Sequence, residues 1–179
     1  DEVDEIVRRL RETVDRHHKR IKEAIEKLKE EVKKHHREIE EYIRRLEEEV
    51  KRLADEQKDK DSLTEELKRI EKSSKELEDK SRDKLRKVRE EIEEMKKRTE
   101  DTLKRLKEEV EDAKRRINTD RKLLEKLDRV LKKLEEDIRR NKEALDRALR
   151  EAEKSLTDNI KELRDVSREI AERIKEITR

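Results

Sequence analysis

The segments HHKRIKEAIEKLKEEVKK (residues 17–34) and HHREIEEYIRRLEEEVKR (residues 35–52) follow each other directly in the chain. They agree at 10 of 18 positions, and each begins with two adjacent histidines. Apolar residues recur in both segments at steps of three and four, which is the spacing of one helical face. Eighteen residues make five turns of about 3.6 residues, the period of an undistorted helix, whereas heptads would impose a supercoil. The stretch therefore predicts a long, straight, amphipathic helix with an 18-residue repeat.

The composition favours helix along the whole chain. Of 179 residues, 60% are charged and 28% are hydrophobic, and there is no Gly, Pro, Cys, Phe or Trp. The 55 basic and 53 acidic residues nearly cancel, whereas disordered chains usually carry a net charge or are rich in Gly, Pro and Ser. The absence of Gly and Pro is unusual for a natural globular domain, which uses them at turns and helix ends.

The apolar pattern lapses twice, at ADEQKDKDSLTEEL and at RRINTDRKLL. In the first lapse, Ser62 and Glu65 have the spacing of a capping box, so we expect the second helix to begin there. In the second, Asn118 suits a helix end, and Thr119 or Asp120 suits the cap of the next helix. These lapses predict helices at about 2–58, 62–117 and 120–178, within one domain over residues 1–179.

Short connections between long helices force neighbouring helices to run antiparallel. The sequence therefore predicts an all-α fold, a straight, antiparallel, up-down-up three-helix bundle with long helices and an 18-residue layer repeat of period 3.6. Three helices close a core within one chain, so no partner is required and we expect a monomer. A homo-oligomer that associates through the charged outer faces stays an open alternative.

The histidines interrupt the apolar stripe of the first helix. On a helical wheel, His17 and His35 lie inside the apolar arc, and His18 and His36 lie at its edge. One repeat later, a leucine and an alanine occupy the two corresponding positions. Histidine has therefore replaced core residues in two repeats out of three.

Polar residues interrupt the other two helices at the same interval, with Ser81 and Thr99 in the second helix and Asn141 and Asn159 in the third. Facing residues have a constant sum of residue numbers in an antiparallel pair and a constant difference in a parallel pair, and both relations place these residues level with the histidines. An unpaired buried polar group costs about 1–3 kcal/mol, so the groups should bond to one another. We predict two polar layers: His17, His18, Thr99 and Asn141, with Thr102 nearby, and His35, His36, Ser81 and Asn159, with Ser155 nearby.

Simpler interpretations apply to some of the polar residues. A histidine at the edge of an apolar stripe is most often partly solvated, and this interpretation stays open for His18 and His36. Tyr42 is expected to fill space at the edge of the core. Three further serines form a weaker polar patch that lacks the 18-residue register, namely Ser73, Ser74 and Ser167.

Helices of near-equal length without Gly or Pro, an 18-residue repeat and polar layers in register together resemble de novo designed, parametrically generated helical bundles with buried hydrogen-bond networks. The resemblance implies a structural scaffold with no natural biochemical activity. Histidine networks in such designs serve as acid-triggered switches, which implies that the four histidines sense pH. Those switching designs resemble symmetric oligomers, whereas this chain carries three distinct helices that can close one core.

Acid sensitivity also follows from the physical chemistry of histidine. A histidine held neutral in a buried network has a folded pKa below its unfolded value of about 6.5. The unfolded chain then binds more protons, so stability is lost as the pH falls through about 6.5 towards the lower folded pKa. The sequence therefore predicts a bundle that acid destabilises.

Two alternative functions fit the sequence less well than the scaffold. A designed metal-binding bundle is conceivable because imidazole binds zinc, copper or nickel, but adjacent histidines diverge by about 100° and the i, i+4 spacing of helical ligands is absent. A natural spectrin-like coiled-coil spacer should show heptads, aromatic residues and turn glycines. We therefore expect no metal and no cofactor.

Other function classes are disfavoured by the same sequence. No nucleophile is paired with a base, and a packed bundle leaves little room for a pocket, so we do not expect an enzyme. The interspersed charges and the single aromatic residue disfavour nucleic-acid binding. Apolar runs never exceed two residues, which argues against a membrane span, and no targeting signal indicates a localisation.

Overall fold

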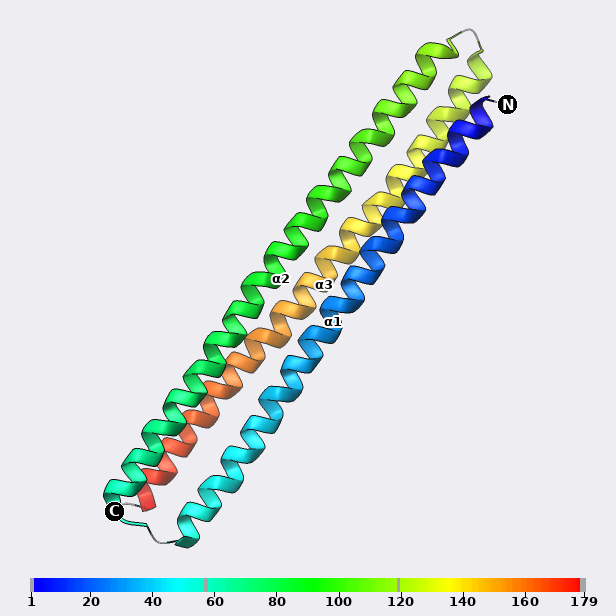
Figure 1. The fold of residues 1–179 in the computed structure, drawn as a ribbon. Helices are drawn as coiled ribbons and strands as arrows, with labels where there is room; N and C mark the ends of the chain where they lie inside the picture. The colour runs from blue at the N-terminus through cyan, green and yellow to red at the C-terminus, as the bar shows by residue number, and fades with distance from the viewer. Residues whose placement is uncertain (1, 57, 119, 178–179) are drawn as a thin grey trace. The chain divides into compact units, whose positions relative to one another are not determined.

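The computed structural model describes residues 2–56, 58–118 and 120–177. Three long α-helices make up nearly all of this part: α1 spans Glu2–Glu56, α2 spans Lys60–Arg116 and α3 spans Arg121–Ile177 (Figure 1). No β-strand occurs among the described residues. The prediction of an all-α fold of three long helices is confirmed, and the straightness of the helices stays a prediction.

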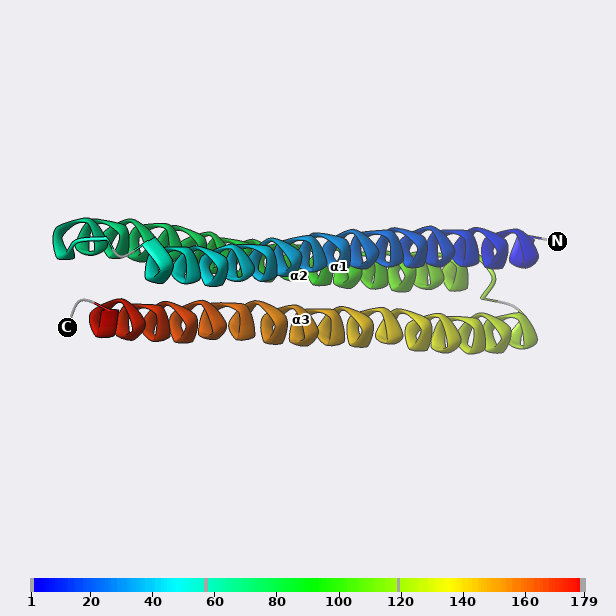
Figure 2. The same ribbon diagram turned by 90° about the horizontal axis from the view of Figure 1, so that it is seen from below.

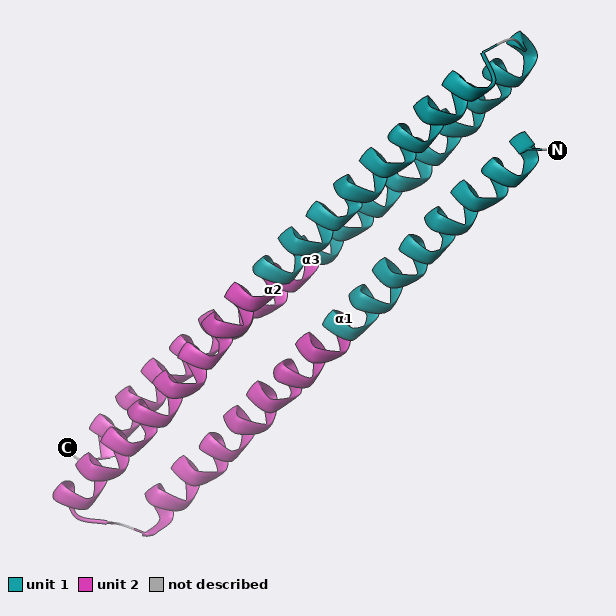
Figure 3. Ribbon diagram, turned by 45° about the horizontal axis from the view of Figure 1, so that its top comes forward, with its two compact units in different colours: residues 1–28, 89–150 teal, residues 29–88, 151–179 magenta. Residues whose placement is uncertain are grey.

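The chain divides into two compact units, each of which contains one segment of every helix (Figure 3). Unit 1 consists of residues 1–28 and 89–150, and unit 2 consists of residues 29–88 and 151–179. Within each unit the three segments lie side by side, with the α1 and α3 segments running in one direction and the α2 segment in the other (Figures 1 and 2). This is the predicted up-down-up order, whereas the single domain over the whole chain stays a prediction.

Local sequence explains why the helices are continuous. No Gly or Pro interrupts them, and apolar residues at steps of three and four give each helix a stripe that packs inward. The outward faces carry ion pairs one turn apart, such as Arg98 with Glu94 at 2.9 Å, and each such pair adds a few tenths of a kcal/mol. Among the described residues, no helix is long and apolar enough to cross a membrane.

All three helices contribute to an apolar cluster in unit 1. Leu10 from α1, Leu106 from α2 and Leu127 from α3 are fully buried there. Burial of one leucine side chain contributes about 1.5–3 kcal/mol, so this cluster supplies most of the stabilisation of the unit. Its buried members are Val3, Ile6, Val7, Leu10, Val14, Leu106, Val110, Ala113, Leu127, Leu134 and Ile138.

Unit 2 contains two apolar clusters. Tyr42 and Val166 are partly buried and pack against both of them. The larger cluster comprises Leu46, Val50, Leu53, Leu63, Ile70, Ile170 and Ile174, and the smaller one comprises Ile39, Ile43 and Leu163.

Aspartates cap the second and third helices. Oδ1 of Asp59 accepts a hydrogen bond from the backbone N–H of Ser62 at 2.8 Å, so α2 begins at Lys60, and the predicted capping box of Ser62 and Glu65 is wrong. Asp59 acts as the cap because its carboxylate reaches the free backbone amide three residues later in the chain. The α1 helix ends at Glu56, before the predicted residue 58.

At the start of α3, Oδ1 of Asp120 accepts from the backbone N–H groups of Lys122 at 3.1 Å and Leu123 at 3.4 Å. Asp120 is therefore the cap of this helix. The alternative cap, Thr119, and the predicted helix end at residue 178 both lie outside the described residues.

Candidate functional site

Layer 1 lies within unit 1 and consists of His17, His18, Thr99 and Asn141. Nε2 of His17 lies 2.9 Å from Oγ1 of Thr99, and Nδ1 of His18 lies 2.8 Å from Oδ1 of Asn141. The side chains of His17, Thr99 and Asn141 are buried, with His17 only 7% exposed, whereas His18 is exposed. The histidines of α1 thus contact one polar residue on each of the other two helices.

Layer 2 lies within unit 2 and consists of His35, His36, Ser81 and Asn159. Nε2 of His35 lies 2.6 Å from Oγ of Ser81, and Nδ1 of His36 lies 2.8 Å from Oδ1 of Asn159. His35 is 1% exposed, and Ser81 and Asn159 are equally buried, whereas His36 is half-buried. The two layers therefore use the same atoms in the same pattern.

A second hydrogen bond of each hydroxyl determines the direction of the histidine contacts. The hydroxyl of Thr99 donates to the carbonyl of Met95 at 2.8 Å, and that of Ser81 donates to the carbonyl of Leu77 at 3.0 Å. A hydroxyl has one hydrogen, so it must accept the bond from the imidazole. The Nε2–H group is therefore the donor in both buried histidines.

The asparagine contacts have the opposite ring nitrogen as donor. An amide oxygen only accepts, so Nδ1–H of His18 and of His36 must donate to Asn141 and Asn159. The amide nitrogen Nδ2 of each asparagine is buried and has no hydrogen-bond partner among the described residues. Each layer therefore retains an unsatisfied donor in the core.

Layer 2 also contacts carboxylates of α1. Nε2 of His36 lies 2.8 Å from Oε1 of Glu40, and since a carboxylate only accepts, this contact requires a proton on Nε2 as well as on Nδ1. Nδ1 of His35 lies 3.8 Å from Oε2 of Glu38, which is too long for a hydrogen bond, and has no partner among the described residues. The geometry at His36 thus suits the imidazolium form.

The pKa values of the two buried histidines, His17 and His35, are both lowered. Burial lowers the pKa of His17 below its ordinary value of 6.5, and Arg20 lowers it further. Burial also lowers the pKa of His35, with added effects of the cations Lys84 and Lys80, while Glu38 acts in the opposite direction. Both rings therefore favour the neutral form in the folded protein.

His36 shifts in the opposite direction. Its hydrogen bond to Asn159 raises the pKa above 6.5 against the effect of burial, and the carboxylates of Glu40 and Glu162 raise it further. Folding therefore favours protonation of His36, whereas it disfavours protonation of the buried His17 and His35.

Ser81, His35 and Glu38 follow the order of a hydrolytic triad, in which a hydroxyl contacts an imidazole that is oriented by a carboxylate. Ser81 is fully buried, however, and its hydrogen is engaged by the carbonyl of Leu77. A nucleophile needs access to a substrate and a base that removes its proton. The arrangement therefore provides packing and pairing but no reactive hydroxyl.

Two of the residues predicted near the layers do not hydrogen-bond to them. The hydroxyl of Thr102 donates to the carbonyl of Arg98 on its own helix at 3.0 Å. Ser155 is half-buried beside His36 and has no hydrogen-bond partner among the described residues. Thr102 lines a hollow together with His17, and Ser155 lines one together with His36, so both lie near their layers without a hydrogen bond to them.

The sequence interpretation missed a third polar cluster, in unit 2. The hydroxyl of Tyr42 lies 2.5 Å from Oγ of Ser73 and 2.9 Å from Oγ of Ser74. Ser73 also donates to the carbonyl of Ile70, so Tyr42 donates to Ser73 and accepts from Ser74. Tyr42 therefore packs at the core edge, as expected, but also bonds the serine patch. In the sequence, the one signal for this cluster is that folding α2 back along α1 places Ser73 and Ser74 beside Tyr42.

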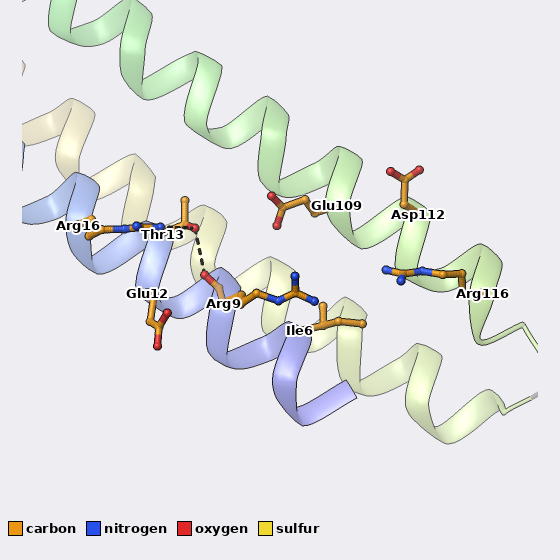
Figure 4. A pocket seen from close by; sticks show the side chains of 8 residues that line it. All are labelled: Ile6, Arg9, Glu12, Thr13, Arg16, Glu109, Asp112 and Arg116. Atoms are coloured by element: carbon orange, nitrogen blue, oxygen red, sulfur yellow. Dashed lines mark hydrogen bonds between the residues drawn. The ribbon is translucent and has the colours of Figure 1, made fainter. Parts of the chain in front are cut away.

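A hollow of about 440 Å³ opens on α1 and α2 in unit 1 (Figure 4). Acidic and basic side chains balance around it, and the hydroxyl of Thr13 donates to the carbonyl of Arg9 on its own helix. The hollow therefore favours neither an anionic nor a cationic ligand. It is lined by Ile6, Arg9, Glu12, Thr13, Arg16, Glu109, Asp112 and Arg116.

Among the described residues, no group of three or more His, Asp or Glu side chains is arranged to hold a metal ion. The adjacent histidines of α1 point to different partners, His17 to α2 and His18 to α3. The layers therefore direct their nitrogen atoms to hydroxyls and amides.

We expect the substitution Ser81→Ala to lower the free energy of unfolding by about 1–3 kcal/mol, because it leaves Nε2–H of His35 buried without an acceptor. Guanidinium denaturation at pH 7.5 measures this loss. Thr102→Ala is the matched control, since that hydroxyl bonds only its own turn, and it should have little effect. Adding His35→Leu to Ser81→Ala should recover most of the loss; equal losses in Ser81→Ala and Thr102→Ala would contradict the pairing.

A scan against protein-family models finds no match, and no curated protein matches the chain. Among solved structures, the chain is similar to a computationally designed three-helix bundle, with a TM-score of 0.67 and 20% sequence identity. The match covers 99% of this chain and 90% of the designed one. The resemblance to designed helical bundles is thus confirmed at the level of the fold: the chain has the architecture of a designed three-helix bundle, in which buried histidines bond Thr and Ser and two less buried histidines bond Asn.

Proposed function

We propose that the chain is a designed structural scaffold in which the two polar layers specify how the three helices align. The observation that carries this proposal is the repeated pairing of α1 histidines with one hydroxyl and one amide on the facing helices. The helix-favouring composition without Gly or Pro and the likeness to a designed bundle support the designed origin.

The layers are suited to alignment because their bonds depend on axial position. If α2 shifted by one turn relative to α1, Met95 or Leu103 would stand where Thr99 accepts from His17. The buried Nε2–H would then have no acceptor, at about 1–3 kcal/mol for each layer. Leucines in the apolar clusters, by contrast, can exchange neighbours with little change in the area that they bury. A polar layer therefore discriminates between alignments that an apolar core tolerates.

The unsatisfied amides indicate that the asparagines lower the stability of the fold while they favour its alignment. Nδ2 of Asn141 and of Asn159 is buried and unpaired among the described residues. A leucine at either position would bury apolar surface instead, as Leu123 does one repeat earlier on α3. The polar residues thus have a role other than raising the free energy of unfolding.

A monomeric scaffold fits the distribution of apolar residues. In each unit the three helix segments cover their own core, and Ile177, at 37% exposure, is the one large hydrophobic residue exposed among those described. No extended apolar face therefore calls for a second chain.

Acid sensitivity is the second part of the proposal. His17 and His35 have lowered pKa values, so the unfolded chain binds more protons than the folded chain below pH 6.5. Their contribution to stability is present above 6.5 and is lost as the pH falls from 6.5 towards the folded pKa values. His36, with a raised pKa, contributes below 6.5 and loses its contribution as the pH rises through its folded pKa. The two buried rings should dominate, because they are both less exposed.

The alignment role predicts that an apolar variant is more stable but less uniquely aligned. The variant carries His17→Leu and His35→Leu with Thr99→Val, Ser81→Ala, Asn141→Leu and Asn159→Leu. Because the chain lacks cysteine, Glu12→Cys and Glu109→Cys introduce one pair of spin-label sites on α1 and α2 of unit 1.

We expect guanidinium denaturation to show a higher unfolding free energy for the apolar variant. Its inter-label distance distribution should broaden or split, whereas the labelled parent should give a single narrow distribution. A single narrow distribution in both proteins would contradict the alignment role.

The acid response predicts that the unfolding free energy of the parent falls between pH 7.5 and pH 5.0, by up to about 1.4 kcal/mol per pH unit for each buried histidine. Replacing His17 and His35 by leucine should flatten this dependence, since Thr99 and Ser81 keep their backbone acceptors. Replacing His18 and His36 by glutamine is the matched control and should preserve the fall, or steepen it by removing the opposing effect of His36. A parent whose denaturation midpoint does not change with pH would refute the acid response.

A further inference from the structure

The two layers are copies of one another under the 18-residue repeat. On α1 and α3, each layer 2 residue follows its layer 1 counterpart by 18 positions, and on α2 it precedes it by 18. The hydrogen bonds join the same atom types in both layers, with distances of 2.6–2.9 Å. A difference in behaviour between the layers must therefore come from their surroundings.

The charges around the layers are not copied. On α1, Glu38 and Glu40 accompany layer 2, and the corresponding positions beside layer 1 hold Arg20 and Lys22. On α3, Glu162 beside layer 2 corresponds to an alanine beside layer 1. Three carboxylates thus surround layer 2 where layer 1 has two cations and a neutral residue.

The carboxylates of layer 2 are placed to accept from protonated rings. Oε1 of Glu40 already lies 2.8 Å from Nε2 of His36. Oε2 of Glu38 lies 3.8 Å from Nδ1 of His35, the one ring nitrogen of that residue without a partner among those described. A proton on this Nδ1 would therefore create a donor that faces a carboxylate.

Cations of α2 oppose this effect in part. Lys80 donates to Oε2 of Glu38 at 3.2 Å. The charge of Lys84 lowers the pKa of His35. On α3, the hydrogen bond of Asn159 and the charge of Glu162 both raise the pKa of His36. Layer 2 therefore has charges of both signs, and Glu40 and Glu38 are the carboxylates within 4 Å of its rings.

Layer 1 lies in a cationic environment. A hollow of about 320 Å³ beside His17 is lined by Arg20 of α1 and by Arg98 and Arg105 of α2, with Asp101 as its one acidic residue. Arg98 pairs with Glu94, and on α3 Lys142, next to the layer, pairs with Glu100 of α2. A proton on His17 would therefore add a cation to a site that already contains three arginines.

We propose that acid opens the two layers in sequence, layer 1 at a higher pH than layer 2, because among the described residues only layer 2 has carboxylates within ion-pair distance of its imidazole rings. The inference rests on the proposed acid response and adds an order to it. Against the effect of burial, Lys80 holds the pKa of Glu38 below its ordinary value, so this carboxylate stays ionised between pH 7.5 and 5.0 and the order should appear within that window.

Hydrogen exchange of the full chain, followed by mass spectrometry and corrected for the intrinsic effect of pH, measures the opening of each layer separately. We expect protection of the amides around residues 14–21 and 95–102 to fall at least tenfold at a pH where protection around residues 32–39 and 77–84 is still retained. Simultaneous loss in both layers would overturn the order while leaving the acid response in place. Full protection of both layers at pH 5.0 would overturn both.

Exchange of the flanking charges provides the matched variants. Glu38→Arg with Glu40→Lys gives layer 2 the α1 flank of layer 1 and should raise its opening pH towards that of layer 1. The reciprocal Arg20→Glu with Lys22→Glu should lower the opening pH of layer 1. Both pairs alter exposed or half-buried positions and leave the apolar clusters intact, and an unchanged order in both variants would refute the role of the carboxylates.

Discussion

In the function that we propose, the alignment of the helix segments within each unit depends on a hydrogen bond between a buried imidazole N–H and a hydroxyl of the facing helix. An apolar stripe alone brings helices together without choosing among axial positions. Once His17 and His35 lie in the core, each requires an acceptor at its own level, because an unpaired buried donor costs about 1–3 kcal/mol. Thr99 and Ser81 supply that acceptor, and their own hydrogens stay bonded to the backbone of α2.

The two kinds of core residue therefore have different effects. Buried leucines, isoleucines and valines provide the stabilisation of each unit, and their non-directional contacts would tolerate several packings. The polar layers contribute less stability, since two amide nitrogens stay unpaired among the described residues, and we propose that their role is to make the observed alignment distinct. The same burial that would make the pairing selective also disfavours the protonated rings, so the proposed alignment role and the proposed acid sensitivity share one cause.

The 18-residue period made the helices and the paired levels predictable, because helical geometry places residues at fixed angles and rises. Residue numbers alone placed Thr99 level with His17 and Asn159 level with His35, but they did not show that His36 is the ring that bonds Asn159. The cap at Asp59, the self-bonded hydroxyl of Thr102 and the bonds of Tyr42 depend on local rotamers and on which of several nearby acceptors lies closest. Helical period does not encode those choices. The carboxylates that distinguish layer 2 were visible in the sequence, but only the distances to the rings identify them as partners.

The protonation state of each ring nitrogen tests this account most directly. Two-bond ¹H–¹⁵N correlation spectra of the histidine rings, recorded at pH 7.5 and at pH 6.5, report which nitrogen carries the proton. The account predicts that His17 and His35 are mostly neutral Nε2–H tautomers at both pH values, while His36 is more than half imidazolium at pH 6.5. Rapidly exchanging tautomers with equal titration of all four rings, as for solvated histidines, would contradict it.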